Sequence, residues 1–394
     1  MPLSASRFLL ALLACLAWGA SAAPADELAR CRLPEKSKHT DIGLGFPRKA
    51  NRLPTIGEIH LTVLFVDFPD VPAAMSPEQA FSIISPLAEA FYARNSYGKL
   101  KLVLDPHPHW TRMSKGSADY RFHRGADFLT HRAYLQEAIT LTPEADFSRA
   151  DGVLAIANPA VRAIDYGPAF TAPPGFGVLA GGREILNGAT SGGDLMSWGW
   201  TWFDHEIGHA MGLPDLAGPA PENGDWNTYV GDFSLMGSPS GAGRDYLGWE
   251  RWLLKWIEDS QVICAGEASL NAALSPIEEA GGSKIVVAPV GESRAVVVES
   301  RRAEWFDERL PGPGLLVYLV DTALNSHQGA VRIAPHSADE THYFSALLTE
   351  GRSIEVEGVK VTALGGDRLH LERVTPPPRT ADSSPDPATV ATRR

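Results

Sequence analysis

The chain has 394 residues, of which 44% are hydrophobic and 21% are charged. These are ordinary globular proportions, so they exclude wholesale disorder and fibrous repeats. The formal net charge is −12 and no run of Lys and Arg supplies a basic face, which argues against a general nucleic-acid binder. At roughly 150 residues per domain, the length predicts about two domains, or one large domain with an appendage.

The first residues have the pattern of a secretory signal peptide. Arg7 supplies a positive charge, an apolar stretch follows, and Ala20-Ser21-Ala22 forms a small-x-small cleavage pattern. The apolar stretch falls short of the ~20 residues that span a bilayer, and no later segment is apolar enough to do so. We therefore expect cleavage after residue 22 and a mature protein without a membrane span, secreted to the periplasm or the extracellular space.

Removal of the signal peptide would take Cys15 with it and leave Cys31 and Cys264. Two cysteines in an oxidising compartment predict a disulfide. An alternative stays open, because Cys31 lies near the mature N-terminus, where its thiolate could occupy the open position of a metal and keep an enzyme latent. Residues 23–55 are polar, with scattered Pro, Lys and Arg, and form the predicted leader or short pro-segment.

The segment that follows alternates strand and helix patterns. A β-rich run at 59–66 predicts a strand. Ser76 as N-cap and Pro77 at the first helical position predict a helix start. A restart at Ser85-Pro86 is an open alternative, and the helical segment is expected to end near residues 96–98. Further strands are predicted at 100–104 and 152–157, and a further helix at 131–140. The alternation indicates a mixed sheet flanked by helices.

Gly and Pro crowd residues 167–193, which predicts a long surface loop. Seven tryptophans then lie between residues 198 and 256. Trp249, Trp252 and Trp256 recur at helical spacing, so we expect core packing, with an aromatic ligand platform as the alternative.

The character changes from residue 284 onward. Val- and Leu-rich strands separated by Gly and Pro are predicted at 284–288, 295–299, 315–320, 353–361 and 368–373. Such a pattern indicates a small β-sandwich or a β-rich subdomain. Residues 375–394 are rich in Pro, Ser, Thr and Asp without an apolar period, which predicts a disordered tail.

One motif carries the chemistry. His205, Glu206 and His209 form an H-E-x-x-H pattern in a stretch free of Pro. Residues four apart on a helix project from one face, so both imidazoles can bind one zinc ion at about 2.0–2.1 Å. Glu206 lies beside that position and can take a proton from zinc-bound water.

A third ligand is predicted just after the helix. Gly212 stands where a helix C-cap glycine belongs, and the turn it permits can bring Asp215 back to the metal. This fits H-E-x-x-H-x-x-G-x-x-[H/D], although Asp215 could also be a turn residue or a calcium ligand. Downstream, Met236 fits the Met-turn that lies beneath such sites, with ordinary core packing as the alternative. A thermolysin-like site with Glu250 as third ligand is a rival interpretation.

These residues carry a family resemblance. Residues 205–216 followed by 232–238 closely resemble the zinc region of the immune inhibitor A-type secreted metallopeptidases, which are relatives of the metzincins. Residues 89–102 and 247–257 resemble that family's segments before and after the site. The resemblance covers roughly residues 56 to 373; its zinc motif is highly specific and its flanking matches are looser.

The resemblance implies an α+β fold, in which a zincin-like catalytic domain with a mixed twisted sheet and an active-site helix precedes a small β-rich, sandwich-like subdomain. It implies a zinc endopeptidase in which His205, His209 and Asp215 bind zinc and Glu206 is the general base. Family members often carry structural calcium, so calcium is a further candidate ion. We expect protein or peptide substrates and a monomer. The long propeptide and further C-terminal domains of many members have no counterpart here, which leaves latency and surface targeting open.

The predicted organisation is a signal peptide (1–22), a leader or pro-segment (23–55), a catalytic domain (56–262), a β-rich subdomain (263–374) and a disordered tail (375–394). The alternative function is a secreted binding protein with a vestigial or structural zinc site. Glu206 argues against it, because a structural site has no use for a base. The stabiliser of the oxyanion stays unassigned, with Tyr246 and Tyr229 as candidates. The remaining histidines considered are attributed to loop polarity: His107, His109, His123, His131, His327, His336 and His342.

Overall fold

The structure is a computed structural model that describes residues 25–39, 41–123, 126–219, 226–266, 269–334 and 340–374. The predicted signal peptide, the predicted tail, Cys15 and His336 lie outside these described residues. Within the described ranges, no helix is both long enough and apolar enough to cross a bilayer.

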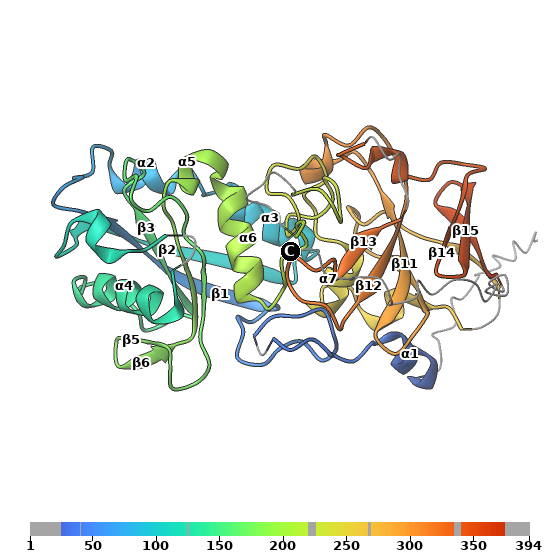
Figure 1. Cartoon of the computed structure of the whole chain (residues 1–394), viewed down its shortest axis with the longest axis horizontal. Helices are drawn as coiled ribbons and strands as arrows, with labels where there is room; N and C mark the ends of the chain where they lie inside the picture. Colours follow the sequence, from blue (N-terminus) through green and yellow to red (C-terminus); the bar gives the residue numbers. More distant parts are fainter. Residues whose placement is uncertain are drawn as a thin grey trace, which may run out of the picture.

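A five-stranded sheet organises the first half of the molecule (Figure 1). Its strands in spatial order are β2 (Leu100–Arg112), β1 (Gly57–Asp67), β3 (Gly152–Ala157), β7 (Asn187–Thr190) and β4 (Ala169–Thr171). The first four run parallel, and β4 pairs antiparallel with β7 at the edge. Along β1, Leu61 and Val63 enter one hydrophobic core while Leu64 and Val66 enter another. Both faces of the sheet are therefore covered, as a mainly parallel sheet requires.

Helices α2 (Pro77–Phe81), α3 (Leu87–Asn95) and α6 (Trp200–Ala210) cover one face of this sheet, and α4 (Phe128–Thr140) covers the other. The remaining described helices are α1 (Ala25–Cys31), which packs against strands of the second half, α5 (Asp194–Trp198) and α7 (Gly248–Leu253), with short 3₁₀ helices at Ser117–Tyr120, Asp259–Gln261, Trp305–Asp307 and Phe344–Ala346. The predicted start of α2 is confirmed, because the Ser76 hydroxyl accepts a hydrogen bond from the Gln79 amide at 3.3 Å. α6 packs against β4 and β7, near the centre of the molecule (Figure 1).

The prediction of one long surface loop at 167–193 is wrong. The segment contains β4, a hairpin of β5 (Val178–Ala180) and β6 (Arg183–Ile185), and β7. These strands are only three or four residues long. At that length an alternating pattern does not stand out against the Gly and Pro of the turns between them. All four residues of β7 are buried within the sheet.

Two further sheets form the second half of the molecule (Figure 1). One has the order β13 (Val331–Ile333), β12 (Gly314–Asp321), β11 (Arg294–Arg301), β10 (Ile285–Pro289) and β8 (Val262–Cys264); the other has the order β14 (Ser353–Val356), β15 (Val359–Gly365), β16 (Arg368–Arg373) and β9 (Leu270–Ala273). Side chains of both sheets, including Val298 and Val361, meet in one hydrophobic core. The predicted single strand at 353–361 is two strands, β14 and the start of β15, joined by a turn.

The tryptophans around α7 belong to the core. Trp249 and Trp256 are fully buried and Trp252 is nearly so. All three side chains lie in the largest hydrophobic core, which also includes Ile277 and Val287 from the second half. Core packing is therefore confirmed for these three residues. The boundary between residues 262 and 263 stays a prediction, and this core contains residues from both sides of it.

The described residues of the 23–55 segment are packed against the rest of the chain. Cys31 and Cys264 form a disulfide, and Leu44 and Leu53 are buried in the largest core. Because Cys31 is bonded to Cys264, its sulfur is not a thiolate that could close a metal site. Removal of residues 23–55 as a pro-segment stays a prediction.

The same segment also completes the end of α6. The amide of Leu53 donates to the carbonyl of Ala210 at 2.9 Å, and the guanidinium of Arg48 donates to the carbonyl of Met211 at 2.8 Å. The last carbonyls of a helix have no partner within the helix, and a cation near them interacts favourably with the helix dipole. The leader therefore stabilises the C-terminal end of the helix that carries the H-E-x-x-H motif.

Candidate metal centre

The two histidines of the motif lie one turn apart on α6, with their rings nearly perpendicular. His205 Nδ1 donates to the carbonyl of Leu235 at 2.9 Å, and His209 Nδ1 donates to the carbonyl of Leu213 at 2.8 Å. A carbonyl only accepts, so the ring proton is assigned to Nδ1 and the lone pair to Nε2 in each neutral imidazole. Both Nε2 atoms are thereby prepared to bind a cation.

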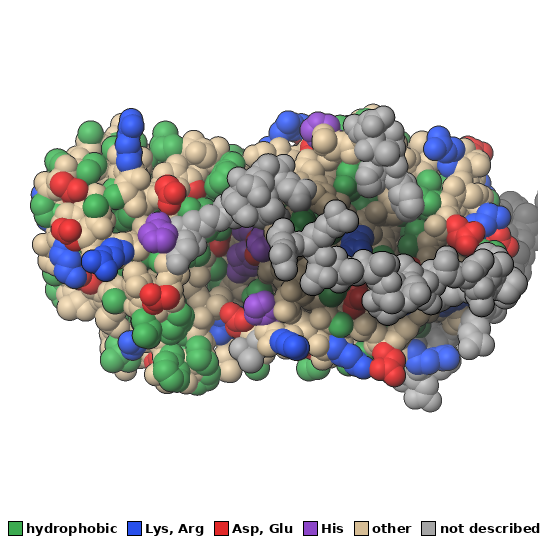
Figure 2. Space-filling view, in the orientation of Figure 1, with side chains coloured by type: hydrophobic (Ala, Val, Ile, Leu, Met, Phe, Trp, Pro, Cys, Tyr) green, Lys and Arg blue, Asp and Glu red, His purple; other side chains and the backbone are tan. Residues whose placement is uncertain are grey.

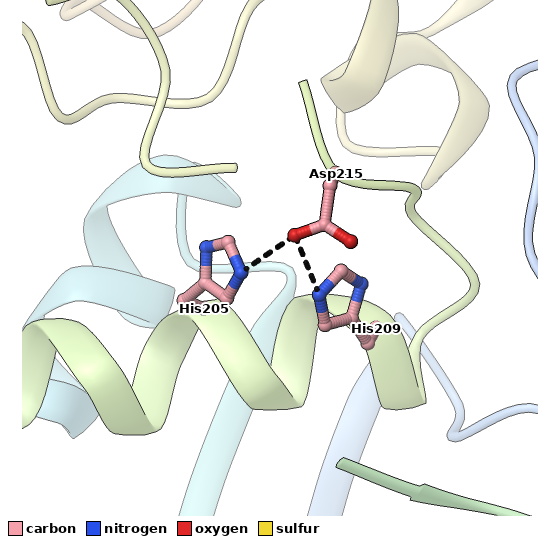
Figure 3. Close-up of side chains that lie close together, drawn as sticks. All are labelled: His205, His209 and Asp215. Carbon is pink, nitrogen blue, oxygen red and sulfur yellow. Dashed lines mark hydrogen bonds and ion pairs between the residues drawn. The ribbon is translucent and has the colours of Figure 1, made fainter. Parts of the chain in front are cut away.

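Asp215 approaches both histidines from beyond the end of the helix (Figure 3). The chain leaves α6 through Gly212, whose φ of +101° suits glycine. Asp215 Oδ1 then lies 3.2 Å from His205 Nε2 and 3.3 Å from His209 Nε2. Two ligands bound tetrahedrally to zinc at about 2.05 Å are separated by about 3.3 Å, so these separations suit one shared ion. The three side chains form a candidate metal-binding group.

Electrostatics couples the members of this group. Burial opposes the charged form of His209, but the Asp215 carboxylate outweighs it and raises the pKa of His209 to about 10. Burial of Asp215 favours its protonation, yet His209 and His205 hold the pKa of this carboxyl well below its ordinary value. A cation that binds here must therefore displace a proton from His209.

Residues from the second half of the molecule support Asp215. Its backbone amide donates to the Ser326 hydroxyl at 3.0 Å, and its Oδ2 lies 3.5 Å from His327 Nε2. Both residues belong to the turn between β12 and β13. His327 lies in a loop, as predicted, and its ring also contacts the carboxylate of Asp215. No spacing in the sequence links His327 to the motif, so only the tertiary fold could reveal this contact.

Glu206 is buried and is held on both carboxylate oxygens. Its Oε1 accepts a hydrogen bond from the Tyr166 hydroxyl at 2.8 Å, and its Oε2 accepts one from the backbone amide of Ala169 at 2.6 Å. Tyr166 and Ala169 come from the segment that leads into β4. Neither was identified from the sequence, in which Ala169 lies within the predicted surface loop and Tyr166 just before it.

Met236 lies directly beneath the motif. A Cβ atom at position 208 would lie 2.5 Å from the Met236 sulfur, so glycine lets the Met236 side chain lie directly against the helix. The carbonyl of Met236 accepts a hydrogen bond from the amide of Leu216 at 2.8 Å, which ties it to the segment that carries Asp215. Met236 is also fully buried in the core, so its role as a Met-turn stays a prediction.

Three residues considered as alternatives lie elsewhere. The carboxylate of Glu250 is buried on α7 and accepts a hydrogen bond from the Ser234 hydroxyl at 2.8 Å. The buried Tyr246 hydroxyl donates to the backbone carbonyl of Asp204 at 2.9 Å, and the ring of Tyr229 packs against Arg332. None of the three lines the pocket at the metal-binding group.

Figure 2 shows histidine side chains in a hollow between the two halves of the molecule. The pocket at the metal-binding group is lined by Tyr166, Trp198, Trp202, His205, Glu206, Asp215, Trp226 and Pro239. An adjoining pocket of about 360 Å³ shares Trp198, Trp226 and Pro239 with it. A larger pocket of about 1030 Å³, beside Phe46 and Trp252, contains no member of the metal-binding group. The candidate metal-binding group therefore lies at the smaller pocket.

A second acidic group lies deep in the molecule. Asp245, Glu278 and Asp307 also bring carboxylate oxygens within 4.8 Å of one another. Here, however, Arg251 donates to Asp245 at 2.7 Å and Arg301 donates to Asp307 at 2.5 Å. The chain itself thus supplies cations to this group.

No protein-family model matches the chain, and no curated protein matches it. Two solved structures of OgpA from Akkermansia muciniphila align with 84% of this chain and 96% of theirs. The catalytically inactive form in complex with an O-glycopeptide (glycodrosocin) substrate has 11% identity and a TM-score of 0.29, and the wild type has 12% identity and a TM-score of 0.30. Scores this low do not establish a common fold.

Proposed function

We propose that the chain is a secreted zinc-dependent endopeptidase. The observation that carries this proposal is the convergence of His205 Nε2, His209 Nε2 and Asp215 Oδ1, with Glu206 beside them on the same helix. The resemblance of the motif to immune inhibitor A-type metallopeptidases, and the mixed sheet with its antiparallel edge strand, are consistent with a zincin-like catalytic domain.

The donor set favours zinc. Two neutral imidazole nitrogens and one carboxylate oxygen, with a fourth position left open, are the ligands of a catalytic zinc site. Calcium prefers six to eight oxygen ligands and magnesium an octahedron of oxygens, which this group does not offer. The carbonyls that fix both imidazole rings provide the outer contacts that metal-ligating histidines require.

Glu206 is the proposed general base. A bound zinc ion would polarise the scissile carbonyl and acidify a neighbouring water. Glu206 then accepts the proton of the attacking water and returns it to the leaving nitrogen, so it ends the cycle ionised as it began. Its burial excludes bulk water and strengthens each electrostatic contact in the pocket.

An extended peptide suits the surroundings of this base. β4 lies at the edge of the five-stranded sheet, and its Ala169 amide contacts Glu206. Main-chain groups of a peptide can pair with such an edge strand. The predicted signal peptide and the Cys31–Cys264 disulfide support export, because disulfides persist in oxidising compartments.

The test is digestion of casein by the purified mature protein, with zinc present, beside a Glu206→Gln variant. We expect cleavage by the first protein alone and the same zinc content in both, because the substitution removes the base and leaves the ligands. If both proteins bind zinc and neither cleaves casein or a mixed peptide library, the chain is a binding protein. Equal cleavage by both would show that Glu206 is not the base.

A further inference from the structure

Segment 166–169 donates a hydrogen bond to each carboxylate oxygen of Glu206. The Tyr166 hydroxyl contacts one carboxylate oxygen at 2.8 Å and the Ala169 amide contacts the other at 2.6 Å. The last torsion of a glutamate is broad and only weakly restricted by itself. Two donors on different oxygens fix this torsion and set the plane of the carboxylate.

The segment is itself firmly anchored. The Gly167 amide donates to Asp194 Oδ2 at 2.8 Å, and the Gly167 carbonyl accepts from Trp202 Nε1 at 2.9 Å. A Cβ atom at Gly167 would lie 2.0 Å from the carbonyl oxygen of Thr190, so the backbone fits tightly against the end of β7. Asp194 is buried and joins this anchor to α5. Tyr166 is therefore presented from a rigid support.

Tyr166, which is half-buried, differs from the buried tyrosines near α6. The hydroxyls of Tyr92 and Tyr246 both donate to the backbone carbonyl of Asp204, a contact that stabilises the helix from behind. Tyr166 instead contacts the side chain of Glu206 and lines the same pocket as the metal-binding group. Its hydroxyl is thus placed to act on the base, while packing alone needs only its ring.

We propose that Tyr166 is the positioning residue of the general base, acting together with the Ala169 amide. Its hydroxyl holds the Glu206 carboxylate beside the metal ligands, with one lone pair directed to the attacking water. This inference rests on the proposed peptidase function.

The first test compares Tyr166→Phe with Tyr120→Phe, using a peptide substrate and zinc alone as probes. Tyr120 is a matched control, because its hydroxyl also donates to a carboxylate, that of Glu137, at 2.6 Å, away from the pocket. For Tyr166→Phe we expect kcat to fall roughly 10- to 100-fold, since hydrogen bonds to charged groups have this strength. KM, zinc affinity and Tm should stay near the wild-type values, and Tyr120→Phe should leave kcat unchanged. A weakened zinc affinity or an unchanged kcat in Tyr166→Phe would overturn the inference.

The second test asks whether Tyr166 acts through Glu206. A peptide hydroxamate chelates zinc and passes its proton to the base, so its Kd reports the position of Glu206 without turnover. We expect Tyr166→Phe to raise the Kd of the hydroxamate about 10-fold when Glu206 is present. In the Glu206→Ala protein, the same substitution should raise the Kd less than about 2-fold. Equal losses in both backgrounds would show that Tyr166 acts independently of the base.

The two proposals fail in different ways. If the wild-type protein is active and Tyr166→Phe matches it, only the inference about Tyr166 fails. If the wild-type protein binds zinc but neither cleaves peptides nor binds the hydroxamate, the peptidase function fails and this inference falls with it.

Discussion

Among the described residues, two groups bring three potential metal ligands within 4.8 Å of one another, but their surroundings differ. At His205, His209 and Asp215, two of the donors are imidazoles and the group lines a pocket. At Asp245, Glu278 and Asp307, all donors are carboxylates, all are buried, and arginines already contact two of them.

The two groups differ in the cation that compensates the negative charge of their carboxylates. Buried carboxylates must be paired or bind metals, because an isolated buried charge is strongly unfavourable. Arg251 and Arg301 meet this need in the inner group, while the central group has only histidines, which can give up their protons to a metal. Proximity of ligands alone therefore does not define a metal site. Four predictions test this distinction.

Loss of an inner arginine should have the largest effect on folding. Arg301 is fully buried and donates to both Glu299 and Asp307, so Arg301→Met would leave two buried carboxylates without their cation. We expect the free energy of unfolding to fall by about 3–5 kcal/mol, measured by urea denaturation. The neighbouring Arg302, whose side chain is 24% exposed and pairs with Asp367, is the control, and Arg302→Met should cost less than about 1 kcal/mol. Equal effects of the two variants would contradict this account of the inner group.

Loss of Asp215 should remove the metal. A structural zinc site with four protein ligands contributes about 10–16 kcal/mol, which corresponds to about 2.5–4 kcal/mol per ligand. We expect Asp215→Ala to weaken zinc binding roughly 100- to 1000-fold, and dialysed protein analysed for metal to be nearly zinc-free. Asp307→Asn and Glu250→Gln should retain zinc. Loss of zinc from Asp307→Asn would place a metal in the inner group and break the comparison.

His327 tests how far the support of the central group extends. Its Nε2 lies 3.5 Å from Asp215 Oδ2, so we expect His327→Ala to let Asp215 turn away from the shared position. Loss of an outer contact of this kind weakens metal affinity about 10- to 100-fold. Competition with a chromogenic chelator would measure the change. His370→Ala, on β16, is the control; a similar loss there would point to a general effect on stability.

The smallest effect concerns the pH dependence of the inner group. Both carboxylate oxygens of Glu278 are buried without a hydrogen-bond partner among the described side chains, although the Arg302 amide lies near enough to favour the ionised form. Burial, reinforced by the Asp307 carboxylate, raises the pKa of Glu278 to about 9. Because this pKa lies above that of an unfolded Glu, the folded protein holds a proton that the unfolded chain loses as pH rises. The stabilisation is complete below about pH 4 and is lost as the pH rises through about 9.

Glu278→Gln should remove this dependence. We expect the stability of the variant relative to wild type to increase steadily between pH 5 and pH 9. Urea unfolding at both pH values would measure this gain. Parallel stability profiles for the two proteins would show that Glu278 does not hold the proton.

The sequence predicts the residues of the central group that lie close together along the chain. It does not predict the contacts from residues far away in the sequence. His205, Glu206 and His209 are set by the period of one helix, and Asp215 follows from a glycine that ends it. Tyr166, Ala169 and His327 reach the site through sheet topology and a turn between distant strands. No spacing rule connects such segments.

The fold shows the same division. Long strands such as β1 were predicted closely, because a continuous apolar run is distinctive. The short strands at 169–190 lie in a segment whose Gly and Pro content predicts a loop. The leader, polar in composition, has buried residues such as Leu33 and Leu53 that secure it to the core. A few buried apolar residues are enough to hold a polar segment against the core. The average composition of the segment does not reveal them.

The bond between Cys31 and Cys264 has a practical consequence for maturation. Lys36 and Lys38 are exposed just downstream of Cys31 and are natural targets for a trypsin-like processing enzyme. A cut there would leave the N-terminal fragment covalently joined to the body of the protein. Such a cut would be invisible on a non-reducing gel, and the fragment would be released only by a thiol reductant.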